Sequence, residues 1–215
     1  MPKIYDLKLK ENFDKKIGSF YKQSMDELSR FYEINWIKNT PSIFLVSSRS
    51  EYDSLTGKKS DDWVVGNAYV GNSILLLSPV AYVKESSHKY SDRDYLWLIK
   101  HELSHLFYNI FTCGNGPIWL IEGTAIYTSG ELEYKKKPEE LKEFLDDYCE
   151  PSQSIYDEAG FVVEALIRTQ SKDKFLKLLE KTKDTFDEDS FRTMFKKHYG
   201  FSLNIREINT FYKEI

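Results

Sequence analysis

Hydrophobic residues recur at helical spacing near the start of the chain. Phe13, Ile17, Phe20 and Met25 follow one another mostly at intervals of three or four residues, with polar residues between them. Residues at these intervals share one face of an α-helix, so the pattern indicates a helix with one buried side. We therefore predict a helix over residues 12–34.

Short apolar runs replace this spacing in the next part of the chain. Residues 43–47 read Ile-Phe-Leu-Val-Ser, and residues 63–70 and 73–78 are two further apolar stretches. Gly71 and Asn72 lie between the last two and suit a tight hairpin turn. The pattern predicts three strands in a small N-terminal α/β part with a mixed sheet.

Beyond residue 90 the pattern is almost wholly helical. Ser91 is a good N-cap for a helix that runs to about Phe111, because its hydroxyl can accept a bond from a free N–H group of the first turn. Pro117 suits the first turn of the next helix, over residues 117–129. Further helices are predicted near residues 138–148, 154–169, 172–183, 187–199 and 203–213. The fold class expected is α+β, with a mainly helical C-terminal part.

Length and composition describe an ordinary globular domain. The chain has 215 residues, of which 41% are hydrophobic and 30% are charged, and this is enough for one core. We expect a single domain over residues 1–215, with an N-terminal α/β subdomain over 1–90 and a helical subdomain over 91–215. The net charge is −4. Because no basic tract stands out beyond residues 135–137, we expect no nucleic-acid partner.

The sequence predicts neither a membrane segment nor a secretory leader. The first residues lack the apolar core of a signal peptide, and the longest apolar runs, such as residues 74–77, are far too short to span a bilayer. Cys113 and Cys149 are too few for a disulfide framework; they could pair once, but two free thiols without a catalytic role are expected. As given, the chain is expected to be cytoplasmic, although a removed leader would leave no trace in it. Nothing in the sequence indicates the oligomeric state.

The sequence His101-Glu102-Leu103-Ser104-His105 is an H-E-x-x-H motif. Residues four apart lie on one face of a helix, so both imidazoles could reach one ion at about 2.0–2.1 Å. Glu102 would project beside that ion, where its carboxylate could accept a proton from a water on the metal. The chain has only four histidines, which makes this spacing a rare coincidence. The alternative is that His101 and His105 are ordinary surface or core histidines.

Glu122 is the candidate for a third ligand. A catalytic zinc ion keeps three protein ligands and one open position. The metzincin pattern is excluded, because Tyr108 and Phe111 stand where it needs Gly and His. Glu122 lies on the next predicted helix, after a short Gly-rich turn that would let the two helices pack antiparallel. A Glu within an apolar stretch is costly to bury unless it is paired or bound to metal, although a solvent-facing Glu is the alternative.

These segments resemble the gluzincin branch of the zincin metallopeptidases, and more narrowly the group called peptidase MA-like. The resemblance is strongest in Ile-Lys-His-Glu-Leu-Ser-His at 99–105 and Trp-Leu-Ile-Glu-Gly-Thr-Ala-Ile-Tyr at 119–127. It extends loosely to residues 156–162 and 195–203, and covers about residues 40–215. It implies a zincin-like fold, one Zn²⁺ as cofactor and hydrolysis of peptide bonds.

By motif position the resemblance also implies residue roles. The residues concerned are the zinc ligands His101, His105 and Glu122, the general base Glu102, and the substrate-facing Tyr156. Some gluzincins orient a ligand His with an Asp four residues after the ligand Glu, but here Ile126 stands there, so that partner must come from elsewhere. Tyr156 is the first candidate to stabilise the developing oxyanion, and Tyr127 and His198 are weaker ones. A packed or surface tyrosine is the alternative for Tyr156.

The sequence therefore predicts a zinc-dependent metallopeptidase that acts on a peptide or protein substrate. The alternatives that stay open are a catalytically inactive zincin-like module that binds peptides or proteins, a regulatory protease with one protein substrate, and an amide hydrolase. Residues 73–78 could offer a backbone edge to an extended substrate, or could form an interior strand that is paired on both sides.

Overall fold

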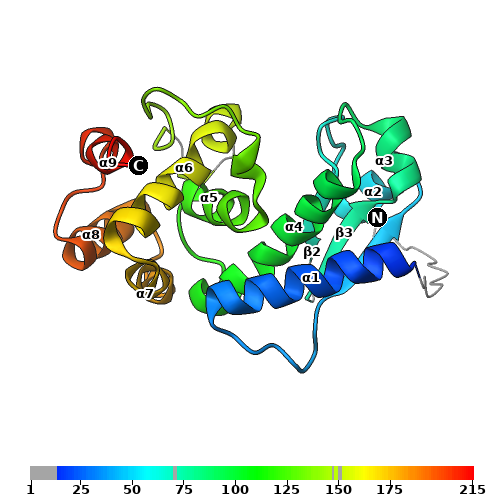
Figure 1. The fold of residues 1–215 in the computed structure, drawn as a ribbon, viewed down its shortest axis with the longest axis horizontal. Helices are drawn as coiled ribbons and strands as arrows, with labels where there is room; N and C mark the ends of the chain where they lie inside the picture. The colour runs from blue at the N-terminus through cyan, green and yellow to red at the C-terminus, as the bar shows by residue number, and fades with distance from the viewer. Residues whose placement is uncertain (1–13, 70–71, 147, 150–151) are drawn as a thin grey trace.

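The computed structural model describes residues 14–69, 72–146, 148–149 and 152–215 (Figure 1). Its elements in chain order are α1 Lys15–Tyr32, β1 Ser42–Val46, α2 Arg49–Thr56, β2 Gly66–Tyr69, β3 Ser73–Leu77, α3 Pro79–Glu85, α4 Asp92–Thr112, α5 Ile118–Ser129, the 3₁₀ turn η1 Glu131–Glu133, α6 Gln153–Gln170, α7 Lys172–Thr182, α8 Glu188–Tyr199 and α9 Ile205–Tyr212. The sheet lies at one end of the molecule and α5 to α9 lie at the other, with α4 between them (Figure 1). This arrangement confirms the α+β class.

The sheet has three strands in the order β1-β3-β2. β1 runs parallel to β3, with Val46 opposite Leu77, and β2 runs antiparallel to it, with Gly66 opposite Leu76. The sheet is therefore mixed, as expected. Because β3 is buried along its length and bonded on both sides, the hypothesis that residues 73–78 offer a free edge is wrong. On that side the outermost strand among the described residues is β2.

Two short helices beside the sheet were not predicted from the apolar pattern. α2 has eight residues and α3 has seven, too few for a helical period to show. Both begin at a serine: the hydroxyl of Ser48 accepts a bond from the third residue after it, and Ser78 does the same before Pro79. In the turn before β3, Asn72 adopts a φ of 64°, whereas Gly71 lies outside the described residues.

The prediction of a helix over residues 138–148 is wrong. The described part of that segment forms bends and a turn, with no helix. The buried carboxylate of Glu158 in α6 accepts the backbone N–H groups of Lys142, Glu143 and Phe144 at 2.9–3.0 Å. Amides that converge on one carboxylate leave the chain without the regular bonds of a helix.

The other predicted helices form within a few residues of their expected bounds. α4 begins after Ser91, whose hydroxyl accepts the N–H of Asp94 at 3.1 Å. α5 ends at Ser129, and Gly130 follows with a φ of 97°, the left-handed conformation that commonly ends a helix. α1 falls inside the predicted range 12–34, of which residues 12–13 lie outside the described part.

α4 is fixed from three sides by polar contacts on its buried faces. The hydroxyl of Ser104 lies 2.8 Å from that of Tyr32 in α1, which runs alongside α4 in Figure 1, and accepts a bond from Thr128 of α5 at 2.8 Å. The hydroxyl of Tyr95 donates to the carbonyl oxygen of Leu77 in β3 at 2.8 Å. These bonds hold α4 at one rotation about its axis, which determines where its histidines point.

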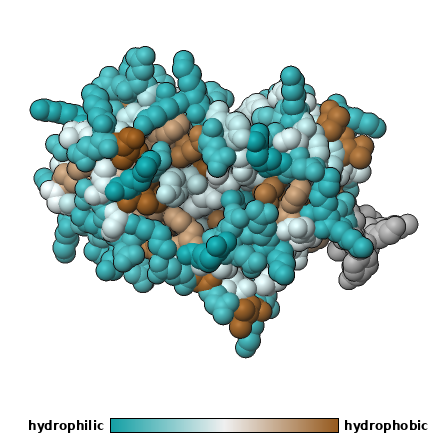
Figure 2. Space-filling view, viewed as in Figure 1, coloured by the Kyte–Doolittle hydropathy of each residue, from teal (hydrophilic) through white to brown (hydrophobic). Residues whose placement is uncertain are grey.

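The face shown in Figure 2 is mostly hydrophilic. Apolar groups gather over the helical end, and another lies over α3, where Val80 and Val83 are exposed. Within the described ranges, no helix combines the length and apolar character needed to cross a bilayer. Cys113 and Cys149 are both exposed, and no disulfide joins them.

Candidate metal centre

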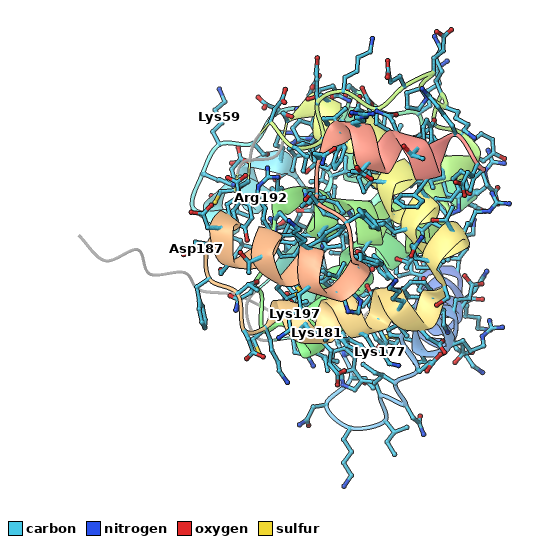
Figure 3. The ribbon with its side chains drawn as sticks, turned by 90° about the vertical axis from the view of Figure 1, so that its left-hand side faces the viewer. Lys59, Lys177, Lys181, Asp187, Arg192 and Lys197 are labelled. Atoms are coloured by element: carbon cyan, nitrogen blue, oxygen red, sulfur yellow. The ribbon has the colours of Figure 1, made fainter. Side chains whose placement is uncertain are left out.

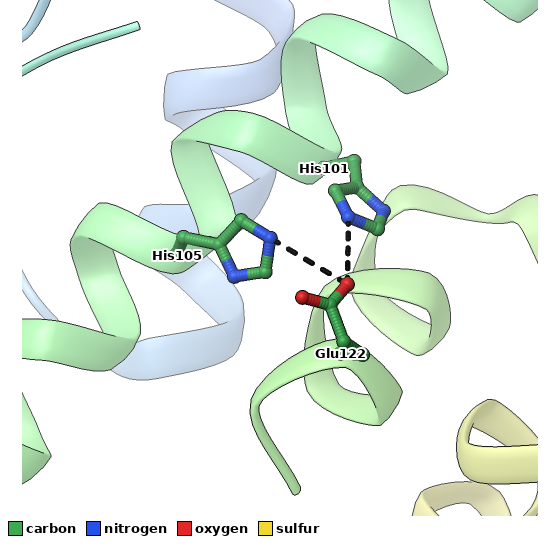
Figure 4. Close-up of side chains that lie close together, drawn as sticks. All are labelled: His101, His105 and Glu122. Atoms are coloured by element: carbon green, nitrogen blue, oxygen red, sulfur yellow. Dashed lines mark ion pairs between the residues drawn. The ribbon is translucent and has the colours of Figure 1, made fainter. Parts of the chain in front are cut away.

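Two histidines of α4 project from the same side of the helix, one turn apart (Figure 4). The ring centroids of His101 and His105 lie 4.9 Å apart, with 80° between the ring planes. Their side chains are only 13% and 14% exposed. The rings are therefore held by packing, while each keeps some access to solvent.

Glu122 of α5 brings a carboxylate to the two imidazoles (Figure 4). Its Oε2 lies 3.4 Å from Nε2 of His101 and 3.8 Å from Nε2 of His105. The ligand atoms of the three residues all lie within 4.8 Å of one another. Two atoms bound at about 2.0–2.1 Å to one tetrahedral ion lie about 3.4 Å apart. The three donors are thus close enough to share one metal ion, and the structure brings together the three residues expected from the sequence.

Close packing of α5 against α6 positions Glu122. A Cβ at Gly123 would collide with the backbone carbonyl of Ala159 in α6. On the α6 side, a Cβ at Gly160 would press into the side chain of Ile126. Only glycine permits such an approach at both positions. α5 is held at a fixed depth by this contact, with its single carboxylate turned toward α4.

A further acidic residue, Glu131, contacts His101 at Nδ1, the ring nitrogen that does not face Glu122. Its Oε1 lies 2.7 Å from Nδ1 of His101 and accepts a bond from the hydroxyl of Ser129 at 2.9 Å. In the neutral imidazole this contact places the proton on Nδ1 and leaves Nε2 free toward Glu122. Metal-binding histidines commonly have such a carboxylate partner. Ile126 has no polar group that could orient a histidine. In the structure the carboxylate partner of His101 is Glu131 of η1.

The sequence contains only a weak signal for Glu131. Gly130 marks the end of α5, and its backbone turns the chain so that the next residue points toward α4. A Cβ at Gly130 would lie 3.2 Å from Nε1 of Trp97, so the turn also sits tightly on α4. The helix end was predictable, but the direction of the following side chain depends on how α5 packs against α4.

Charges at the site decide which histidine is protonated when no metal is bound. Burial alone would lower the pKa of His101, but the carboxylates of Glu131 and Glu122 outweigh burial and hold that pKa well above 6.5. Burial lowers the pKa of His105 to about 4, because the charge of Glu122 offsets only part of the desolvation. Burial would raise the pKa of Glu122, but the two histidines lower it. The metal-free site therefore favours a proton on His101 over one on His105.

Glu102 lies under β2. Its Oε1 is only 2.9 Å from where a Cβ would stand at Gly66, and its carboxylate accepts the N–H of Ala68. Burial, reinforced by the charges of Glu122 and Glu131, raises the pKa of Glu102 to about 7. A carboxyl group with such a pKa can both accept and return a proton at neutral pH.

Tyr156, at the start of α6, belongs to the same site. Burial, together with the charges of Glu122 and Glu102, raises the pKa of its hydroxyl above 10, so the group keeps its proton at neutral pH. None of the hydrogen bonds between described residues uses this hydroxyl. Its ring packs edge-on against Trp63, with centroids 5.8 Å apart.

The two weaker oxyanion candidates lie elsewhere. Tyr127 faces Phe31 of α1, with ring centroids 6.0 Å apart. His198 of α8 has its Nε2 2.8 Å from the carbonyl oxygen of Lys174 and its Nδ1 3.1 Å from Nζ of Lys181. Figure 3 views that end of the molecule, formed by α7 to α9, and labels Lys181. Neither residue is placed to reach a substrate at the three donors.

No family model matches this chain, and searches of curated proteins and of solved structures find no match either. What the site can do therefore follows from its own groups. It brings together three possible metal donors, a buried carboxyl group with a pKa of about 7, and a tyrosine hydroxyl that no hydrogen bond between described residues uses.

Proposed function

We propose that this chain is a zinc-dependent peptidase with a zincin-like fold, in which His101, His105 and Glu122 hold one Zn²⁺. The observation that carries the proposal is the spacing of three donors from two helices, which suits a tetrahedral ion with one open position. The contact of Glu131 with His101 supports it. Two imidazoles with one carboxylate also favour zinc over calcium or magnesium, which prefer oxygen ligands.

The catalytic work is divided between two side chains. When bound, zinc supplies a Lewis acid and lowers the pKa of a water molecule toward about 7. Glu102 accepts a proton from the attacking water and passes it to the leaving amine, a role for which its raised pKa suits it. Tyr156 donates its hydroxyl hydrogen to the substrate carbonyl oxygen as negative charge develops there, and its own raised pKa keeps that proton in place.

The outer edge of β2 favours a peptide as substrate. Leu77 donates its N–H to the carbonyl oxygen of Val65 at 3.0 Å, so the alternation of an antiparallel pair turns the backbone groups of Gly66 and Ala68 away from β3. The Gly66 carbonyl is bonded to α2, and the Ala68 N–H donates to Glu102. None of the hydrogen bonds between described residues uses the carbonyl oxygen of Ala68, which leaves that oxygen for an added strand. A peptide bonded there would pass beside Glu102.

Zinc binding is expected to release at least one proton near pH 7. A coordinating imidazole nitrogen must be free of its proton, and the raised pKa of His101 means that the metal-free protein carries one there. Zinc affinity should therefore rise about tenfold per pH unit until the pH passes that pKa. Calorimetric titration in two buffers of different ionisation enthalpy gives the proton number. A value near zero at pH 7 would contradict this assignment of charge.

The direct test is to measure metal content and cleavage together. The purified chain is expected to bind one zinc per molecule and to cleave members of a mixed peptide pool, as followed by mass spectrometry. Chelation should stop cleavage, and added zinc should restore it. One bound zinc without cleavage would point instead to the peptide-binding module, whereas failure to bind zinc would remove the proposal altogether.

A further inference from the structure

Trp63 is an exposed aromatic residue held in a fixed place. It lies three residues before β2, and 47% of its surface is exposed. A single exposed apolar residue is ordinary by itself. Trp63 differs because it meets Tyr156 of the candidate site, and because its own backbone is unusually well anchored.

The anchoring comes from Arg49 in α2. Its guanidinium donates, at 2.6–3.1 Å, to three carbonyl oxygens around Trp63: those of Asp61, Asp62 and Val64. The same group donates to the carbonyl oxygen of Glu85 at 2.8 Å, which ties the loop to α3. The carbonyl oxygen of Trp63 itself lies 2.8 Å from Nε2 of His88. A loop so fixed presents its side chain in one position, without an entropic cost when a ligand binds.

The Trp63–Tyr156 contact joins the two parts of the chain at the metal centre. Trp63 precedes the outer strand β2, whereas Tyr156 belongs to α6 on the helical side. The rings meet edge to face, at 68°. Tyr156 is close enough to Glu122 and Glu102 to be affected by their charges. Nearly half of the indole stays open beside a tyrosine that lies at the catalytic groups.

We propose that Trp63 and Tyr156 form a subsite that selects a large apolar side chain, preferably aromatic, within two residues of the scissile peptide bond. This inference rests on the proposed peptidase function. Trp63 stands five residues before Ala68, and its ring contacts Tyr156, so the proposed subsite lies beside the carbonyl that the Tyr156 hydroxyl binds. The Tyr156 hydroxyl serves the reacting carbonyl, while its ring and the indole bind the neighbouring side chain.

The chemistry of the surroundings favours this class of side chain over others. An aromatic side chain against two rings gains both burial and ring contact, and the preference over alanine should be about tenfold or more. An acidic side chain is disfavoured, because burying its charge against two aromatic rings carries a desolvation cost. The subsite is therefore selective for apolar side chains and against negative charge.

The test uses the zinc-loaded full chain and a peptide series. In a background of Gly, Ser and Ala, a single Phe is moved one position at a time, and matched peptides carry Ala instead. Wild-type protein should cleave at a fixed distance from Phe, with kcat/KM about tenfold or more above the Ala peptides. Trp63→Ala should bring this ratio below about threefold. Trp63→Phe should restore most of the preference.

Controls separate the subsite from the fold and from the reaction. Phe186 is 84% exposed and far along the chain, and Phe186→Ala should leave the ratio unchanged. If Trp63→Ala does not fold, Trp63→Leu replaces it in the test. The ratio of kcat/KM on Phe peptides to that on Ala peptides should then fall at least about threefold. A ratio that survives these Trp63 changes overturns the subsite but leaves the peptidase standing. No cleavage of any peptide by zinc-loaded wild-type protein overturns both.

Discussion

Replacing Glu102 by Gln is expected to lower kcat at least about a hundredfold while zinc stays bound, because general acid–base catalysis contributes on the order of 10²–10⁴-fold. The amide has the shape of the carboxyl group, so it still fits beside Gly66 and can still accept the N–H of Ala68. It cannot take a proton from water at neutral pH. The measurement is kcat on a cleaved peptide, with zinc content determined on the same sample.

The control is Glu133→Gln, which makes the same change at an exposed residue of η1. It should leave both kcat and zinc content unchanged. Glu102→Gln should also fold at least as stably as the wild type without metal, because a neutral amide removes the cost of burying a charge that raises the pKa of Glu102 to about 7. Wild-type turnover by Glu102→Gln would show that another group moves the proton.

Replacing Glu122 by Gln is expected to weaken zinc binding more than about a hundredfold, because it removes the only negatively charged donor of the three. Glu131→Gln should have a smaller effect, about 10- to 100-fold, because Glu131 acts through His101 and not on the ion. Competition against a chromogenic chelator at fixed pH gives both affinities. The decisive result is that Glu122→Gln loses more zinc affinity than Glu131→Gln.

The opposite ranking would reassign the ligand set. If Glu131→Gln lost zinc more completely than Glu122→Gln, the carboxylate of η1 would be the donor, and Glu122 would be a neighbour of the ion. Because Glu122 is buried, its replacement could unfold the protein, and an unfolded protein would also fail to bind zinc. Circular dichroism of both metal-free variants shows whether each is folded.

The part of the site that sequence predicted is the part governed by local geometry. His101 and His105 face the same way because a helix repeats about every four residues, and the helix itself was marked by Ser91. Glu122 followed from a short turn between two apolar helices. Each of these inferences needed only the spacing along one or two neighbouring elements, and the structure brings the three side chains together.

The features that sequence missed depend on long-range packing. Glu131 reaches His101 only because α5 sits at a particular depth against α4 and α6. The strand order, which makes β2 and not β3 an outermost strand among the described residues, is a property of the sheet and not of either strand. Residues 138–148 have a helical pattern, but the backbone N–H groups of residues 142–144 donate to the carboxylate of Glu158 in α6 instead of forming helical bonds. The sequence did not indicate a role for Trp63, since the Tyr156 ring that contacts it lies far along the chain.

The groups proposed to hold the ion come from one continuous stretch, from His101 to Glu131, whereas the aromatic pair is drawn from a loop before it and a helix after it. Holding the ion and choosing the substrate are thus assigned to separate pieces of chain. On the proposed function, exchanging the segment between α2 and β2 would redirect the protein to other peptides and leave the three candidate metal donors in place. Such modularity lets one reaction be adapted to many targets by changes confined to a surface loop.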